Sequence, residues 1–228
     1  MLIMKQKLYN DGIGFVELVD YVGSDITVVN SARVSFGKHK STLDAADKKL
    51  IKYLIQHKHN STLEHCFVTF RVKVPLFVRS QHHRHRTWSY NEISRRYTDF
   101  NIEFYEPSSF RTQHESNRQA SKEELINPTI ELNSASEKVK EFHAQGLKLF
   151  NELITSGVCR EQARGVLPQN MYTEYYASAN LNNIMKFIDL RIHEGAQWEI
   201  QEMAKAMLEI ISKLYPVTVE AYRELRTS

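Results

Sequence analysis

The sequence predicts a protein of the α+β class, with a sheet and long helices in one domain. Residues 67–74 alternate apolar and polar side chains, as a strand with one buried face does. Residues 139–153 and 196–214 carry apolar side chains at alternating spacings of three and four, which is typical of amphipathic helices that face a core or a subunit interface. No linker rich in Gly, Ser or Pro interrupts the chain, so we expect a single domain over residues 1–228.

The same two periodicities predict the shorter elements. Alternation indicates strands over residues 13–20 and 171–177, and helical spacing indicates helices over residues 25–34, 47–57 and 181–191. Pro75 should end the strand of residues 67–74, because proline lacks the amide N–H that a strand ladder uses. A helix is expected after Pro75, followed by a loop and a strand near residues 97–105. Pro216 should end the last helix.

Residues 107–134 form the least regular part of the sequence. They are polar, with few large apolar side chains. Such composition favours a surface excursion. We expect little chemistry in it.

Size and cysteine content restrict the class of protein. A chain of 228 residues can bury a sufficient core without disulfides. Cys66 and Cys159 form no CxxC pair, so neither a disulfide framework nor a cysteine zinc site is expected, and a reducing compartment fits. The first ten residues lack the apolar core of a signal peptide, and no later stretch is long enough to span a membrane. We therefore expect a cytoplasmic protein with no membrane partner.

Positive charge is concentrated in one part of the chain. The formal net charge is only +3, yet residues 71–97 hold seven Lys or Arg and one acid, Glu92. The rest of the chain holds more acidic than basic residues. This distribution favours a focused anion pocket over the broad basic face of a duplex-binding protein. The alternative is a solvated basic surface.

The densest part of this charge is the segment RHRTWSYNEISRRY at residues 84–97, which includes four arginines, His85 and Trp88. The eight glycines of the chain form neither GxGxxG nor a P-loop, so phosphate groups would have to be bound by side chains. Arginine is suited to this because its guanidinium group meets two oxygens at once and keeps its charge. The segment therefore predicts binding of an anionic, planar, nucleotide-like ligand.

Two other kinds of site are less well supported. Histidines at ligand-like spacing occur in two groups, His57, His59 and His65 with Glu64, and His82, His83 and His85. Because many arginines surround them and would repel a cation, we expect no metal. Ser94 stands between arginines and has no evident base nearby, so we do not expect it to act as a nucleophile.

Residues 84–97 match in full the RHRxxSxNExSxRY signature, and the sequence resembles the flavin-dependent thymidylate synthases. The similarity continues through GFVELVD near the start, SARVSF at residues 31–36, residues 59–65, Gln81, CREQARGVLP at residues 159–168, and the LR and AQWEI elements near residues 191 and 196. The chain departs from the commoner family pattern at Ser61-Thr62-Leu63, Asn180-Leu181-Asn182 and Gly195.

The resemblance implies reductive methylation of dUMP to dTMP. The carbon would come from methylenetetrahydrofolate and the reducing hydride from NADPH through bound FAD, with tetrahydrofolate released and no cysteine nucleophile used. It also implies an antiparallel-rich sheet flanked by long helices, and a homotetramer with active sites shared between subunits. The alternative function is a binding module for single-stranded nucleic acid or nucleotides, without turnover.

Matching positions imply the site residues. The expected FAD contacts are Ser35, His59, Ser61, Arg84, His85, Arg86, Asn91, Glu92, Asn180, Asn182 and Lys186. The expected dUMP contacts are Gln81, Arg84, Glu92, Ser94, Arg95, Arg96, Arg164 and Arg191. Arg191 is the expected catalytic residue, because a cation against the uracil ring favours the ionised form of the ring.

Overall fold

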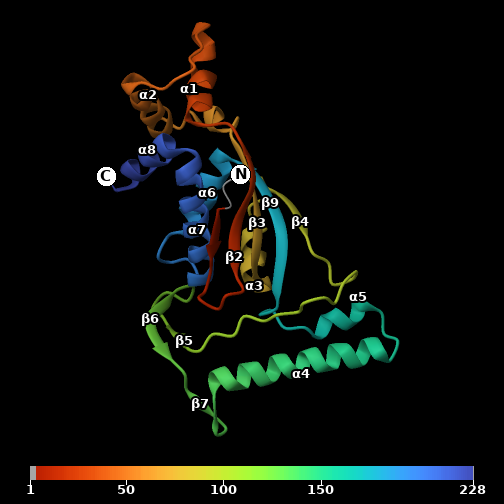
Figure 1. Ribbon diagram of the computed structural model, residues 1–228. Helices are drawn as coiled ribbons and strands as arrows, with labels where there is room; N and C mark the ends of the chain where they lie inside the picture. Colours follow the sequence, from red (N-terminus) through yellow and green to blue (C-terminus); the bar gives the residue numbers. More distant parts are fainter. Residues whose placement is uncertain (1–3, 228) are drawn as a thin grey trace.

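The computed structural model describes residues 4–227, in which a five-stranded antiparallel sheet forms the centre. Its strands lie in the order β1-β2-β3-β9-β4 (Figure 1). Their bounds are β1 Lys5–Lys7, β2 Phe15–Val22, β3 Phe67–Pro75, β9 Tyr172–Asn180 and β4 Ser89–Glu92. Strand β4 is therefore an edge strand formed by the arginine-rich motif itself.

The two faces of the central strand β3 differ in chemistry. Strand β3 pairs with β9 from Phe67 opposite Asn180 to Pro75 opposite Tyr172. Because side chains alternate across a strand, Val68, Phe70, Val72 and Val74 all point into the core, where they are buried. Polar pairs occupy the other face, among them Arg71 with Glu174, whose Nε and Oε1 lie 2.5 Å apart. This alternation confirms the strand predicted at residues 67–74.

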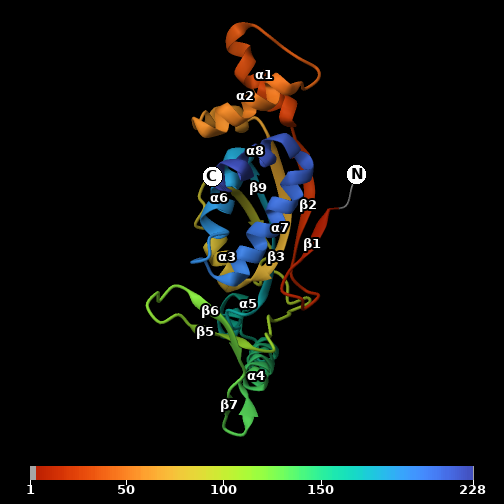
Figure 2. The same cartoon turned by 90° about the vertical axis from the view of Figure 1, so that its left-hand side faces the viewer.

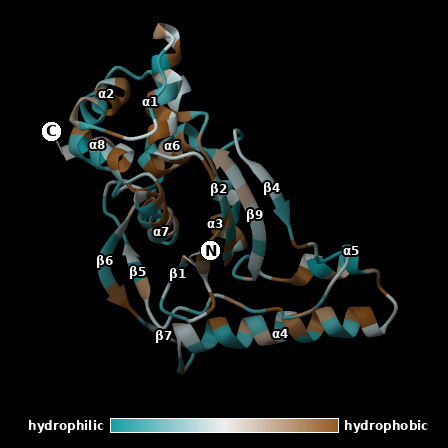
Figure 3. Cartoon of the chain, turned by 45° about the horizontal axis from the view of Figure 1, so that its top comes forward, coloured by the Kyte–Doolittle hydropathy of each residue, from teal (hydrophilic) through white to brown (hydrophobic). Residues whose placement is uncertain are grey.

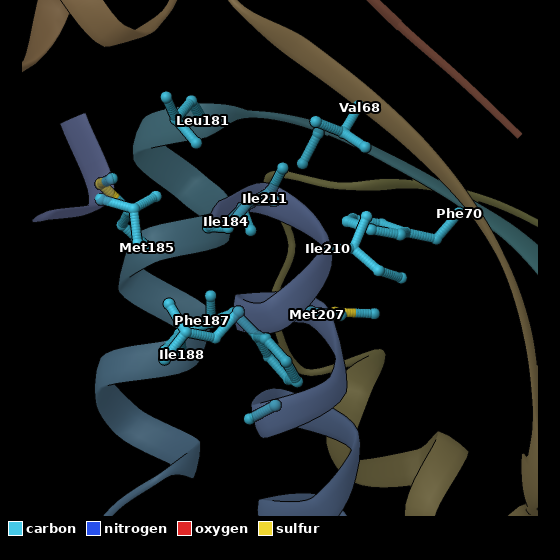
Figure 4. Packing of buried hydrophobic residues seen from close by; sticks show 14 of the residues in the cluster. Val68, Phe70, Leu181, Ile184, Met185, Phe187, Ile188, Met207, Ile210 and Ile211 are labelled. Carbon is cyan, nitrogen blue, oxygen red and sulfur yellow. The ribbon is translucent and has the colours of Figure 1, made fainter. Parts of the chain in front are cut away.

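Three helices cover the apolar face of the sheet: α3 Leu76–His82, α6 Leu181–Arg191 and α7 Trp198–Leu214. Figure 4 shows Phe70 of β3, Ile184 of α6, and Ile210 and Ile211 of α7 in one hydrophobic cluster. All four side chains are fully buried. The cluster holds α6 and α7 against the sheet and so positions the C-terminal end of α6, where Arg191 lies.

One end of the molecule is helical. It contains α1 Asp25–Arg33, η1 Val34–Phe36, α2 Ala45–Gln56, η2 Asn60–Leu63 and α8 Pro216–Thr227. Buried Asp25 accepts hydrogen bonds from the amides of Val217 and Thr218, at 3.0 and 2.9 Å, and so ties α1 to α8. Helix α8 was not predicted. Pro216 ends α7 as expected, but proline is also well tolerated in the first turn of a helix, and a new helix begins there.

The opposite end holds α4 Ala135–Thr155, α5 Arg160–Ala163 and η3 Arg164–Val166 (Figure 2). Figure 3 shows apolar and polar residues alternating along α4, which runs below the sheet. Phe150 of this helix is fully buried, but Phe142 is 59% exposed and Leu149 is 44% exposed. The apolar stripe of α4 is thus only partly used within this chain.

Residues 107–134 contain four short strands that the sequence pattern did not reveal. They are β5 Phe110–Gln113, β6 Ser121–Ile126, β7 Thr129–Ile130 and β8 Asn133–Ser134. Pairing of β5 with β6 and of β7 with β8 forms two antiparallel hairpins. Most side chains of residues 121–132 are exposed.

The helices predicted at residues 25–34, 47–57, 139–153, 181–191 and 196–214 and the strands at residues 13–20 and 171–177 are confirmed with small shifts of their ends. The strand predicted near residues 97–105 is wrong. The guanidinium of Arg95 instead donates to the carbonyls of Phe100 and Asn101, at 2.7 and 3.4 Å, and Asn101 adopts a φ of 52°, so the backbone turns there. A single bridge between Phe104 and Met171 remains.

Helices long and apolar enough to cross a bilayer are absent from residues 4–227.

Replacing Phe70 with Ala is expected to lower the free energy of unfolding by about 3–5 kcal/mol, because the variant leaves a cavity between β3 and α7. Phe67→Ala is the matched control, since Phe67 lies on the same strand but is 48% exposed. The control should lose less than half as much. Urea denaturation of both variants measures the difference, and equal losses would contradict this view of the core.

Candidate active site

The arginine-rich motif is held in place by an aromatic cluster under the sheet. Trp88 is only 7% exposed and its ring centroid lies 4.7 Å from that of His82 and 5.7 Å from that of Phe187. The hydroxyl of Tyr90 donates to the carbonyls of His82 and His85, at 2.9 and 3.1 Å. These contacts fix the turn between α3 and β4, so that the apolar residues of the motif anchor its charged residues.

Arg191 meets the motif at the end of α6. Its Nε lies 3.2 Å from Nε2 of His85, and one terminal nitrogen lies 3.2 Å from the backbone carbonyl of Gln81. Both partners are neutral acceptors, so the charge of Arg191 is not compensated by them. The structure thus brings together Gln81, His85 and Arg191, three of the residues that the sequence singled out.

His85 is held neutral at this junction. Burial, and then the charge of Arg191, lower the pKa of the His85 imidazole to about 4. Because Nε2 accepts from Arg191, the proton of the neutral ring resides on Nδ1. His85 therefore offers Nδ1–H as a donor while Arg191 carries the positive charge.

Glu92 compensates Arg79 and not the motif arginines. Its Oε1 lies 3.1 Å from Nε of Arg79 and accepts a hydrogen bond of 2.6 Å from the hydroxyl of Thr173. Both partners come from elements that pack against β4. Glu92 is therefore fixed at the end of β4 with one oxygen occupied by these two contacts.

The arginines divide into two groups by their ion pairs. Seven of the fourteen arginines form an ion pair with a carboxylate: Arg33, Arg71, Arg79, Arg111, Arg160, Arg223 and Arg226. The other seven form none with any Asp or Glu that the structure describes: Arg84, Arg86, Arg95, Arg96, Arg118, Arg164 and Arg191. Six of these seven are the arginines predicted to bind FAD or dUMP. Their uncompensated charge suits anionic ligands such as a pyrophosphate and a nucleotide phosphate.

A second cluster of polar side chains lies at the end of the motif. Oγ of Ser94 accepts from the amide of Arg96 at 3.3 Å, and the side chain of Arg96 donates to the hydroxyl of Tyr97 at 2.9 Å. Arg95 is buried and holds the loop after the motif through its carbonyl contacts. Arg160 pairs with Asp99 at 3.1 Å, which connects this loop to α5 and the exposed Arg164.

Of the remaining predicted FAD residues, all except Asn91 lie outside residues 84–97. Ser35, His59 and Ser61 are exposed around η1 and η2, and among residues 4–227 no hydrogen bond or ion pair joins them to the motif. Asn182 donates to Oε1 of Glu64 at 2.9 Å, so the start of α6 is tied to η2. The other three residues take separate positions: the side chain of Asn180 caps α6, Lys186 is exposed on α6, and exposed Asn91 lies on β4.

A cavity that sequence reasoning missed lies beside the hairpin of β5 and β6. It has a volume of about 1070 Å³, and its lining includes Tyr105, Arg111, His114, Lys122 and Trp198 but none of the predicted site residues. Next to it Glu199 is buried, with Oε1 2.6 Å from a terminal nitrogen of Arg111. The only sequence signal was a glutamate within the AQWEI element, at the start of an apolar helix.

The two histidine groups considered above do not gather around one point among the described residues. In the part of the chain that the structure describes, no three His, Cys, Asp or Glu side chains gather closely enough to hold a metal ion. His82 and His85 instead contact aromatic rings, and burial lowers the pKa of both.

The fold is similar to that of solved nucleotide methylases. The crystal structure of the UMP/dUMP methylase PolB from Streptomyces cacaoi bound with 5-Br dUMP has a TM-score of 0.82 to this structure, with 32% sequence identity over 96% of this chain and 97% of that chain. The structure of the same methylase bound with 5-Br UMP has a TM-score of 0.77, with 33% identity over 96% of each chain.

Sequence comparison specifies the family. The family model described as thymidylate synthase complementing protein matches residues 17–217. The flavin-dependent thymidylate synthase of Thermus thermophilus is 42% identical over 92% of this chain and 76% of its own length. That of Kosmotoga olearia is also 42% identical, over 92% of this chain and 90% of its own length. The chain belongs to the flavin-dependent thymidylate synthase family, which confirms the resemblance carried by residues 84–97.

The low pKa of His85 should make the protein less stable in acid. Between about pH 6.5 and the folded-state pKa of about 4, the unfolded chain protonates this ring while the folded chain does not. The stabilisation of the folded state by the neutral His85 is therefore complete above the pKa of the unfolded chain, and it is lost as the pH falls toward the folded-state pKa of about 4. In His85→Gln, the unfolding free energy should drop less between about pH 7.5 and 4.5. Urea denaturation at several pH values measures this drop. An equal drop in wild type and variant would contradict the low pKa of His85.

Proposed function

We propose that this chain catalyses the reductive methylation of dUMP to dTMP. Methylenetetrahydrofolate donates the carbon, NADPH provides the reducing hydride through bound FAD, and tetrahydrofolate is released. The relatives named flavin-dependent thymidylate synthases and the dUMP methylase fold support this reaction. The observation that carries the proposal is the set of six arginines at predicted site positions without a carboxylate partner. Such groups match the phosphates of both ligands.

FAD binding is assigned to the residues at the positions that match the family pattern. The proposed contacts are Ser35, His59, Ser61, Arg84, His85, Arg86, Asn91, Glu92, Asn180, Asn182 and Lys186. Arg84 and Arg86 are exposed and unpaired, and the neutral ring of His85 can donate through Nδ1. When bound, FAD supplies the hydride that converts the transferred methylene group into a methyl group. Positive charge beside the isoalloxazine favours the anionic reduced ring.

The nucleotide is assigned to the arginines and polar groups around the motif. The proposed contacts are Gln81, Arg84, Glu92, Ser94, Arg95, Arg96, Arg164 and Arg191. Arg191 is the proposed catalytic residue. Its Nε and one terminal nitrogen are held by His85 and Gln81, and its other terminal nitrogen has no partner among residues 4–227. A fixed, half-buried cation of this kind stabilises negative charge that develops on the uracil ring.

The alternative of a single-stranded nucleic-acid module is less well supported. Such modules stack bases on exposed aromatic rings. Trp88, the largest ring of the motif, is buried against His82 and Phe187 and cannot stack on a base. The burial of Trp88 instead favours a structural role, in which its ring fixes the motif against the core of an enzyme site.

We further propose a single-domain subunit that assembles into a homotetramer with shared active sites. Arg164 and Arg191 are both assigned to the nucleotide, yet α5, which directly precedes Arg164, lies beside α4 at one end of the molecule, whereas α6, which ends at Arg191, packs against the sheet (Figures 1 and 2). One nucleotide could contact both arginines if they came from different chains. The exposed Phe142 and Leu149 of α4 supply apolar surface for contacts between subunits.

The reaction is tested with purified protein, FAD, dUMP, NADPH and isotopically labelled methylenetetrahydrofolate under anaerobic conditions. The wild type should bind FAD, bleach with NADPH and transfer labelled carbon to dTMP. Arg191→Ala should keep FAD but lose methyl transfer by about a hundredfold or more, because charge stabilisation at the uracil is removed. Arg118→Ala is the control, since Arg118 is the one unpaired arginine among residues 4–227 outside the proposed site.

A wild-type preparation that cannot be loaded with FAD and forms no dTMP would refute the reaction. Normal turnover of Arg191→Ala would refute the role of that residue alone. A loss in Arg118→Ala as large as that in Arg191→Ala would show that any unpaired arginine matters to the same extent.

Shared sites predict complementation between inactive variants. Arg164→Ala and Arg191→Ala should each be inactive as pure proteins, whereas coexpressed subunits should regain part of the activity, since some sites would combine intact halves from two chains. The measurement is dTMP formation by hybrids purified through two different tags, with light scattering to establish the number of subunits. Hybrids as inactive as the pure variants would contradict shared sites.

A further inference from the structure

A chain of side-chain hydrogen bonds joins the buried carboxylate of Glu199 to Gln81. Nε2 of Gln197 lies 2.9 Å from Oε2 of Glu199, and Nε2 of Gln81 lies 2.5 Å from Oε1 of Gln197. The carboxylate is also an ion-pair partner of Arg111, at 2.6 Å, and accepts from the hydroxyl of Tyr105 at 3.2 Å. The side chain of Gln197 therefore links the buried carboxylate of Glu199 to Gln81, a proposed nucleotide contact.

The carboxylate of Glu199 determines which group donates in each of these hydrogen bonds. An ionised carboxylate only accepts hydrogen bonds, so Gln197 must turn its NH₂ group toward Glu199 and its carbonyl toward Gln81. Gln81 must then turn its own NH₂ group toward Gln197. Only this orientation of both amides satisfies the two contacts.

The consequence is a defined polarity at Gln81. Its Oε1 has no partner among residues 4–227, and its second amide N–H is also free, while its backbone carbonyl accepts from Arg191. A side chain fixed in this way offers one acceptor and one donor in a set order. Uracil presents N3–H beside a carbonyl oxygen, whereas cytosine presents an unprotonated N3 beside an amino group.

We infer that Glu199 and Gln197 are positioning residues that fix the amide of Gln81 as the acceptor for N3–H of the neutral uracil ring when the nucleotide first binds, before the ring is ionised beside Arg191, and thereby discriminate against cytosine nucleotides. The inference rests on the proposed function, since it assigns Gln81 to the base of dUMP. Neither positioning residue touches the nucleotide. They exclude the flipped orientation of the Gln81 amide. In that orientation the NH₂ group would face the base and could donate to the unprotonated N3 of cytosine.

The test is calorimetric titration of FAD-loaded protein with dUMP and with dCMP, without NADPH or folate, so that binding is measured apart from turnover. The wild type should prefer dUMP, and Glu199→Gln should reduce this preference by about tenfold or more, because a neutral amide at position 199 no longer dictates which end Gln197 presents. Gln197→Met should reduce the preference similarly, and it keeps the ion pair between Glu199 and Arg111.

A rescue variant separates polarity from general damage. In the double variant Gln197→Glu with Glu199→Gln, a carboxylate again accepts from Gln81, so the preference for dUMP should return even though Arg111 has lost its ion pair. Asp25→Asn serves as the matched control, because Asp25 is a buried carboxylate that accepts two backbone hydrogen bonds and an additional one from the Thr218 hydroxyl, without any contact to Gln81. It should cost stability and leave the preference unchanged.

Several results would overturn the inference. An unchanged preference in Glu199→Gln or in Gln197→Met would do so, as would a double variant no better than Glu199→Gln, since Glu199 would then act through Arg111. A wild type that binds dUMP and dCMP equally well also refutes it. A wild type that binds neither nucleotide would instead refute the proposed function, and the inference with it.

Discussion

Uncompensated positive charge at the edge of the sheet is the constraint on which the rest of this structure depends. Like charges repel, and a half-buried guanidinium group loses hydration, so the site is costly until anions bind. The fold meets this cost with an apolar framework beneath the charges. Trp88, His82 and Phe187 pack under the motif, and the hydrophobic cluster of β3, α6 and α7 holds that layer in place. Stability and ligand binding are thus assigned to different residues of the same segment.

The neutral histidine beside Arg191 follows from the same constraint. Burial of the imidazole, and then the charge of Arg191 3.2 Å away, disfavour a second cation here and lower the pKa of His85. The result is a pair with divided roles, in which Arg191 contributes charge and His85 contributes a directional donor. Two acidic groups leave the charges of the motif arginines and Arg191 uncompensated, because Glu92 pairs with Arg79 and Glu199 pairs with Arg111. Negative charge therefore orients the neighbourhood of the site without neutralising it.

Much of the fold was predictable, because it rests on local periodicity. Residues 67–74 alternate strictly since one face of β3 meets the core and the other meets polar partners on β9. Short elements escaped prediction for physical reasons. Strand β4 has only four residues and is stabilised by pairing with β9, and the turn after it depends on carbonyl contacts of Arg95 that no sequence pattern records. Helix α8 began at a proline that was interpreted only as a stop signal.

By itself, the sequence determined the family, the concentration of arginines in residues 84–97 and the helices and strands that carry regular patterns. Those properties are written in residue types and spacings along the chain. Tertiary structure alone decided which arginines stay unpaired, that His85 is neutral beside Arg191, and that Glu199 is linked to Gln81 through Gln197. These depend on distances between residues far apart in sequence, because charge, burial and hydrogen bonding act through space.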